Sequence, residues 1–139
     1  MTYKPSWDEI WMSLAKNISL RSHSPTLKVG SVIVTSDNES VLSLGYNGGA
    51  IGDNNLPDSL EPGQSGFIHA ECNAIAKMNY NDHRVRKMYL THNPCRVCAK
   101  LIINAKIQKL YYCEEYRDTS GLFILQDRGI IVEKCKFWE

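Results

Sequence analysis

The chain of 139 residues is long enough to bury one hydrophobic core, and we interpret residues 1–139 as a single domain. Its 43% hydrophobic and 22% charged residues are typical of a globular protein, and a net charge of +1 disfavours a nucleic-acid partner. No segment approaches the roughly 20 apolar residues that span a bilayer and residues 1–8 lack a signal-peptide core, so we expect no membrane and a cytoplasmic location.

The first half of the chain predicts one helix, a β-hairpin and a long loop. Apolar side chains recur every three or four residues over 7–18, and Ser6 precedes them as an N-cap, which predicts a helix. Residues 21–28 are polar and predict a loop. The β-branched segments 29–35 and 41–46 predict the hairpin. Residues 47–66 contain five Gly and two Pro and predict a long loop, a kind of segment that is often functional.

The second half alternates helices and strands. We predict helices over 69–80, 95–105 and 119–128, and strands over 85–91, 109–114 and 130–135. Strands joined through helices are parallel, with right-handed crossovers. The predicted fold is therefore α/β, with three α-β-α layers and a mixed five-stranded sheet whose last strands are parallel.

Two of the five cysteines form the pattern Cys95-x-x-Cys98 at the start of a predicted helix. A spacing of three places both sulfurs on one side, and a helix N-terminus favours the thiolate that binds metal. A redox pair of the thioredoxin type is the alternative, but it leaves His69 and Glu71 without a role. The other cysteines, Cys72, Cys113 and Cys135, are interpreted as small apolar residues.

His69 and Glu71 are two positions apart, about 200° around a helix, so they can serve one site only within a first turn. One imidazole and two thiolates suit zinc, and three protein ligands leave a position open, as in catalytic zinc sites. Zinc would supply an activated water, and Glu71 would move protons during hydrolysis of an amino-substituted heterocycle.

The motifs resemble those of the zinc-dependent cytidine and deoxycytidylate deaminase superfamily. His69-Ala70-Glu71 and the PCxxC of residues 94–98 mark the superfamily. The GYNG of residues 45–48 and the HAECNAI of residues 69–75 resemble the deoxycytidylate (dCMP) branch. The resemblance implies a cytidine deaminase-like fold and hydrolysis of dCMP to dUMP and ammonia, which supplies the dTMP precursor.

The same resemblance assigns roles to individual residues. It makes His69, Cys95 and Cys98 the zinc ligands and Glu71 the catalytic acid and base. Substrate contacts would come from Asn47 near the sugar, Tyr116 against the pyrimidine or the pocket mouth, Arg21 or Lys28 at the phosphate, and Ala70. A plain turn at Asn47, a solvated Arg21 and rim packing by Tyr116 are the alternatives.

The family also implies partners. Its members commonly form hexamers, and many are activated by dCTP and inhibited by dTTP, so we expect a homo-oligomer and dCTP or dTTP effectors with Mg²⁺. The sequence departs from the family pattern at residues 49–52, which leaves the effector response open. A second, structural zinc is not expected, because only His23 is available for it.

Three alternatives share parts of this pattern. A tRNA adenosine deaminase has different residues directly before its His-Ala-Glu motif, where residues 66–68 precede His69 in this chain. Its substrate is also a polyanion, which the low net charge of this chain disfavours. Cytidine, guanine and riboflavin-pathway deaminases share the zinc site and differ in the pocket. A non-catalytic, zinc-stabilised binding module would normally use four protein ligands, and three are apparent.

Overall fold

The computed structural model describes residues 2–116 and 118–136. Its sheet has five strands in the order β2-β1-β3-β4-β5. β1 pairs antiparallel with β2 and β3, whereas β3, β4 and β5 are parallel neighbours. The strands are β1 (Gly30–Thr35), β2 (Val41–Tyr46), β3 (Arg86–His92), β4 (Ile107–Glu114) and β5 (Ile131–Lys134). The predicted hairpin and the mixed sheet with parallel last strands are confirmed.

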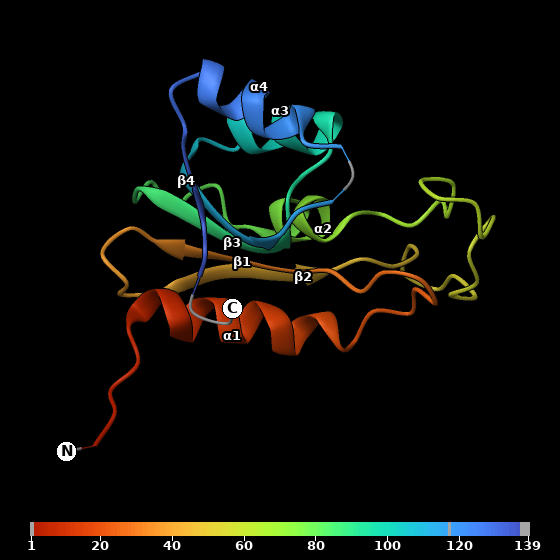
Figure 1. The fold of residues 1–139 in the computed structure, drawn as a ribbon, viewed down its shortest axis with the longest axis horizontal. Helices are drawn as coiled ribbons and strands as arrows, with labels where there is room; N and C mark the ends of the chain where they lie inside the picture. The colour runs from red at the N-terminus through yellow and green to blue at the C-terminus, as the bar shows by residue number, and fades with distance from the viewer. Residues whose placement is uncertain (1, 117, 137–139) are drawn as a thin grey trace.

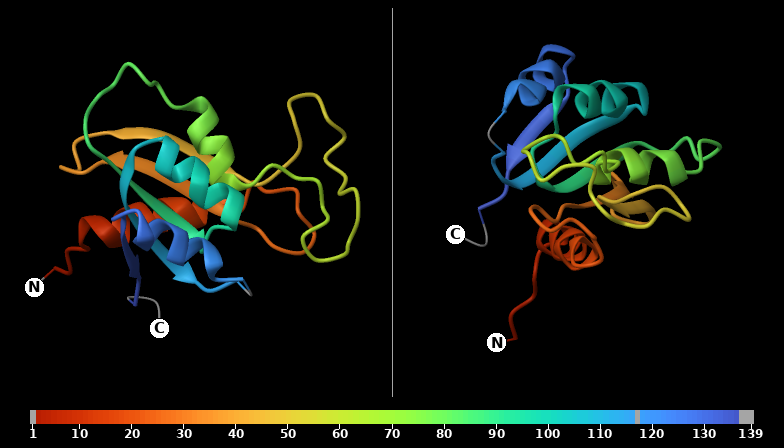
Figure 2. Two further views of the ribbon diagram at one scale, coloured as in Figure 1. Left: turned by 90° about the horizontal axis from the view of Figure 1, so that it is seen from above. Right: turned by 90° about the vertical axis from the view of Figure 1, so that its right-hand side faces the viewer.

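The helices cover the two faces of the sheet unequally. α1 alone lies on one face, and α2, α3 and α4 lie on the other (Figures 1 and 2). The helices are α1 (Trp7–Ser19), α2 (Ala70–Lys77), α3 (Arg96–Asn104) and α4 (Ser120–Asp127). The three-layer prediction is confirmed. Among the described residues, no helix has the length and apolar character to cross a bilayer.

Alternation along β1 divides the core between the two faces. Val32 and Val34 pack in the cluster under α1, while Ile33 packs in the cluster under α2, α3 and α4. Successive strand residues point to opposite faces, so a fully buried strand serves both layers. At Gly30 a Cβ atom would stand 1.9 Å from the carbonyl oxygen of Ala15, so α1 packs directly on the strand backbone.

Two predicted boundaries were wrong. α2 ends at Lys77 rather than at residue 80, because Met78 is extended (φ −71°, ψ 144°) and buries its side chain in the core. The Tyr80 hydroxyl then donates to the carbonyl oxygen of Ile75 across the helix end. β4 begins at Ile107, two residues earlier than predicted, because this side chain is almost fully buried. Tertiary burial decided both boundaries.

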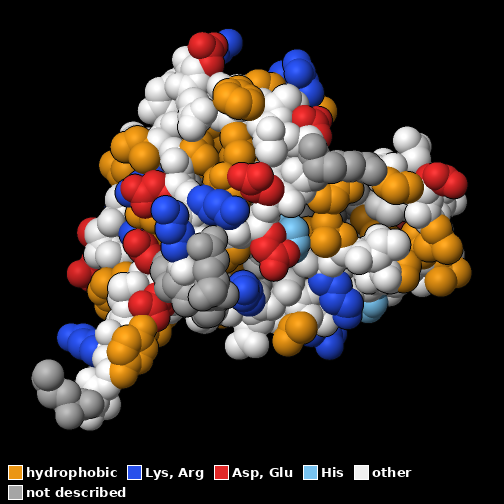
Figure 3. Space-filling view, in the orientation of Figure 1, with side chains coloured by type: hydrophobic (Ala, Val, Ile, Leu, Met, Phe, Trp, Pro, Cys, Tyr) orange, Lys and Arg blue, Asp and Glu red, His pale blue; other side chains and the backbone are white. Residues whose placement is uncertain are grey.

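The loop between β2 and α2 extends away from the three layers (Figures 1 and 2). An antiparallel bridge between Gly48 and Ile68 closes its base. Three apolar side chains on the loop are exposed: Ile51, Leu56 and Leu60. Hydrophobic atoms are visible on the surface at the end of the molecule where this loop lies (Figure 3). The base of the loop leads directly into the start of α2.

Candidate active site

The candidate site is built from the starts of α2 and α3. His69 is the N-cap of α2 and has extended backbone angles (φ −69°, ψ 154°), so Glu71 is only the second residue of the helix. Cys95 is the N-cap of α3, and its sulfur accepts a hydrogen bond from the backbone N–H of Cys98 at 3.3 Å. Because His69 lies before the first helical residue, it is not bound to the 200° separation of a helix interior.

The three predicted zinc ligands are brought together. The Nδ1 atom of His69 lies 3.1 Å from the sulfur of Cys98 and 3.5 Å from that of Cys95. The ligand atoms of all three residues lie within 4.8 Å of one another. One imidazole nitrogen and two sulfurs are donors that zinc prefers, and their number leaves one position for water or substrate. The residues therefore fit a catalytic zinc ion.

The protonation states of these ligands are coupled. A hydrogen bond from Cys98, supported by His69, lowers the pKa of Cys95 from 9.0 to about 4. The hydrogen bond to Cys95 raises the pKa of His69 from 6.5 to about 9. Hydrogen bonds to Cys72 and Cys95 raise the pKa of the Cys98 thiol. Since a metal binds thiolates and neutral imidazole, metal binding must release protons from this group.

Glu71 is the buried carboxyl of the site, with 3% of its surface exposed. Burial raises its pKa from 4.5 to about 7, and the nearby His69 charge offsets only part of that effect. A carboxyl with this pKa can both accept and return a proton near neutral pH.

A cavity of about 890 Å³ opens over these residues. Its volume lies within the range of small-molecule sites. Of the predicted site residues, six line it: Asn47, His69, Ala70, Glu71, Cys95 and Tyr116. Cys98 is buried and is not among the lining residues. Arg21 and Lys28 are exposed and are not among the lining residues, so the structure does not bring them to this cavity.

Asn47 has a definite structural role as well as a place in the cavity wall. Its Oδ1 accepts from the backbone N–H of Val29 at 2.9 Å, and its Nδ2 donates to the carbonyl oxygen of Leu27 at 2.8 Å. The segment from Ser24 to Leu27 also lines the cavity. Asn47 therefore joins the end of β2 to the segment that precedes β1, which also lines the cavity.

Sequence reasoning missed three residues near the site. The Cys72 sulfur lies 3.2 Å from that of Cys98, although Cys72 was interpreted as a plain apolar residue. His92 and Asn93 both line the cavity. Their position directly before the PCxxC motif was the one available signal. His92 Nε2 pairs with Glu114 at 3.0 Å.

Comparisons with known proteins cover both motifs. A family model described as the cytidine and deoxycytidylate deaminase zinc-binding region matches residues 5–114. The deoxycytidylate deaminase of Pongo abelii is 36% identical over 122 residues, which are 81% of this chain and 68% of that protein. ComE operon protein 2 of Bacillus subtilis is 31% identical over 141 residues, covering 96% of this chain and 74% of that protein.

A solved structure has the same fold over nearly the whole chain. The dCMP deaminase from cyanophage S-TIM5, in complex with dCMP and dUMP, superimposes with a TM-score of 0.83 at 36% sequence identity. The match covers 96% of this chain and 100% of that chain.

Proposed function

The chain belongs to the cytidine and deoxycytidylate deaminase family, and we propose that it hydrolyses dCMP to dUMP and ammonia, supplying the dTMP precursor. The observation that carries the proposal is one cavity in which the buried Glu71 adjoins the cluster of His69, Cys95 and Cys98. The relatives named for this activity support dCMP as the substrate.

We assign the zinc to His69, Cys95 and Cys98. When bound, zinc supplies a Lewis acid that makes a water molecule acidic near neutral pH. The low pKa of Cys95, the N-cap of α3, provides one thiolate ligand in advance, whereas the Cys98 thiol, whose pKa is raised, would release its proton when metal binds. His69 and Cys95 also line the cavity, in which the cytosine ring would lie.

Glu71 is the proposed acid and base. Hydrolysis adds water across the C4–N3 double bond of cytosine and expels ammonia, so one proton must reach the ring nitrogen N3 and another must reach the departing amine. Glu71 accepts the first proton from the attacking water and gives it to N3; it then takes the second proton from the C4 hydroxyl and gives it to the amine as the C4–N bond breaks and the C4 carbonyl forms. Its raised pKa of about 7 suits a group that must carry a proton in both directions.

The remaining walls provide the proposed substrate contacts. Ala70 is the first residue of α2, where backbone N–H groups have no partner within the helix and can donate to the substrate. Asn47 and Tyr116 line the cavity and are proposed to contact the sugar and the pyrimidine. Contact of Arg21 or Lys28 with the phosphate stays a prediction; it requires these exposed side chains to reach the cavity mouth.

Further properties are proposed from family membership. We propose a homo-oligomer, with a hexamer as the family precedent; the exposed apolar side chains of Ile51, Leu56 and Leu60 support an interface between copies. Regulation by dCTP and dTTP with Mg²⁺ stays a prediction. All five cysteines are free, which supports the proposed cytoplasmic location. The family match over residues 5–114 supports one deaminase domain.

A substrate panel tests the proposal. Zinc-loaded protein is incubated with dCMP, CMP, dCTP, deoxycytidine and a tRNA, and turnover is followed by the loss of cytosine absorbance. We expect dCMP to give the highest kcat/KM. A higher kcat/KM for dCTP or deoxycytidine would contradict the substrate assignment, and turnover of the tRNA alone would contradict the proposed branch of the family.

A further inference from the structure

Asn93 connects the end of β3 to the chain that follows β4, beside the metal-ligand cluster. Only 5% of its surface is exposed, and it directly precedes Pro94 and Cys95. Its backbone N–H donates to the carbonyl oxygen of Glu114 at 3.2 Å, which continues the β3–β4 pairing beyond the strand. Its position in the fold is therefore fixed independently of its side chain.

The side-chain amide of Asn93 makes two further hydrogen bonds. Oδ1 accepts from the backbone N–H of Tyr116, and Nδ2 donates to the carbonyl oxygen of Asp118 at 2.9 Å. Tyr116 and Asp118 lie between the end of β4 and the start of α4, outside any helix or strand. One buried amide thus bonds the backbone at Tyr116 and at Asp118.

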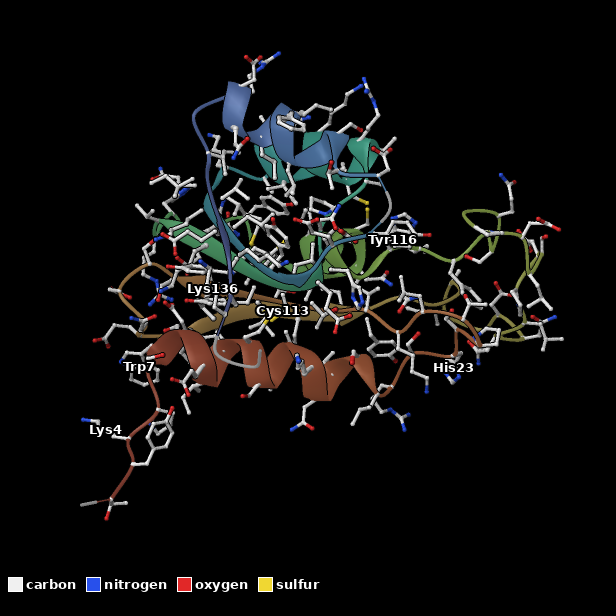
Figure 4. All side chains as sticks on the ribbon, viewed as in Figure 1. Lys4, Trp7, His23, Cys113, Tyr116 and Lys136 are labelled. Atoms are coloured by element: carbon white, nitrogen blue, oxygen red, sulfur yellow. The ribbon has the colours of Figure 1, made fainter. Side chains whose placement is uncertain are left out.

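Tyr116 is half-buried and lies at the end of β4, on the side from which the long loop leaves (Figure 4). It shares the cavity wall with Asn93, Glu71 and Cys95. A tyrosine ring can only form a consistent wall for a planar base if its backbone is held in place. The pair between His92 and Glu114 ties the same turn to β3 from the neighbouring position.

We propose that Asn93 is a positioning residue, which holds Tyr116 against the cavity so that its ring forms part of the nucleotide-binding wall. This inference rests on the proposed function. Asn93 is not one of the proposed zinc ligands, and its side-chain amide bonds the backbone at Tyr116 and Asp118, so it acts through Tyr116. Its removal should therefore weaken nucleotide binding more than it slows the chemical step.

A double-mutant cycle on the zinc-loaded protein tests the proposal, using Asn93→Ala, Tyr116→Ala and the double variant with dCMP as substrate. Loss of a buried hydrogen-bonding group is worth roughly a factor of 10, so each single variant should raise KM about 10-fold. Zinc content and kcat should stay within about 2-fold of the parent protein. The double variant should be no worse than either single variant, because both changes remove the same wall.

Ser43→Ala is the matched control. It removes a side-chain hydrogen bond to the carbonyl oxygen of Ala74 at 2.6 Å, between β2 and α2, and Ser43 is not among the cavity-lining residues. It should lower thermal stability without changing KM. If Asn93→Ala does not fold, Asn93→Asp keeps the acceptor for the Tyr116 N–H and should change KM less than Tyr116→Ala does.

The outcomes separate the two proposals. Absence of turnover by the parent protein with every cytosine nucleotide would contradict the proposed function. If the parent protein turns over dCMP but the Asn93 variant has an unchanged KM, the role of Asn93 is contradicted while the proposed function stands. The same holds if the KM of the double variant rises by the product of the two single-variant increases. Loss of zinc from the Asn93 variant would also contradict it, since that outcome indicates support of the ligand loop instead.

Discussion

Gly45→Ala should damage both the stability and the active site, although residue 45 lies outside the cavity lining. A Cβ atom there would stand 2.6 Å from the carbonyl oxygen of Ala70 and 2.7 Å from the backbone nitrogen of Ala74. Both atoms belong to the backbone of α2, so the rotation of a side chain cannot relieve the contact. Raising 2.6 Å to the 3.4 Å of ordinary contact requires α2 to move by about 0.8 Å.

Overpacking of this kind costs about 1–3 kcal/mol. For a chain of this length we expect a fall in Tm of about 4–12 °C. The displaced end of α2 carries His69 and Glu71, and a misplacement of about 1 Å in a site can cost a factor of about 100 in rate. Thermal denaturation by circular dichroism and kcat with dCMP measure the two effects.

The control is the second glycine of the same GYNG motif. A Cβ atom at Gly48 would meet only the Tyr46 ring edge, at 4.0 Å, and Gly48 is not among the described glycines with positive φ. Gly48→Ala should therefore change Tm by less than about 2 °C. An unchanged Tm and kcat in the Gly45 variant, or equal losses in both variants, would refute the packing argument.

Four further predictions concern the cavity itself. Glu71→Gln should retain zinc, measured by atomic absorption, while kcat falls by about 10²–10⁴-fold. Because the pKa of Glu71 in the folded protein is raised to about 7, its ionisation opposes folding as pH rises above 4.5. Glu71→Gln should therefore raise the Tm of the metal-free protein at pH 8 and leave it unchanged at pH 4. An equal Tm of the two proteins at pH 8 would contradict this. Zinc affinity, measured by competition with a chelating dye, should rise at least about tenfold per pH unit between pH 6 and 8, because metal must displace the proton of His69, whose pKa is about 9; a flat profile would argue against that ligand. Asn47→Ala removes two bonds to the Leu27–Val29 wall and should raise KM for dCMP about tenfold or more, with zinc content unchanged as the control.

The order of the elements was predictable because local patterns determine it. The β-branched run Val32, Ile33 and Val34 and the helical periodicity over residues 7–18 are both visible in short windows. The ends of α2 and β4 were not predictable in this way. Met78 and Ile107 are held by core contacts with residues far along the chain, and no local signal reports such contacts.

The metal ligands could be predicted because His69, Cys95 and Cys98 carry chemistry that few other roles explain. The supporting residues could not. Asn93 and Tyr116 are 23 positions apart, and a single asparagine before a proline has many structural uses. The Cys72–Cys98 approach arises from two helix starts meeting in space, which their separate sequences do not report. The phosphate contact assigned to Arg21 by resemblance stays a prediction, since this side chain is exposed and is not among the cavity-lining residues.

The central claim is that this cavity hydrolyses the amino group of dCMP. The most direct measurement is the amount of ammonia and dUMP formed when zinc-loaded protein is incubated with dCMP. We expect one ammonia for each dUMP, with turnover abolished by a chelator and restored by zinc while the fold persists. Zinc-loaded, folded protein that forms neither product from dCMP would contradict the account.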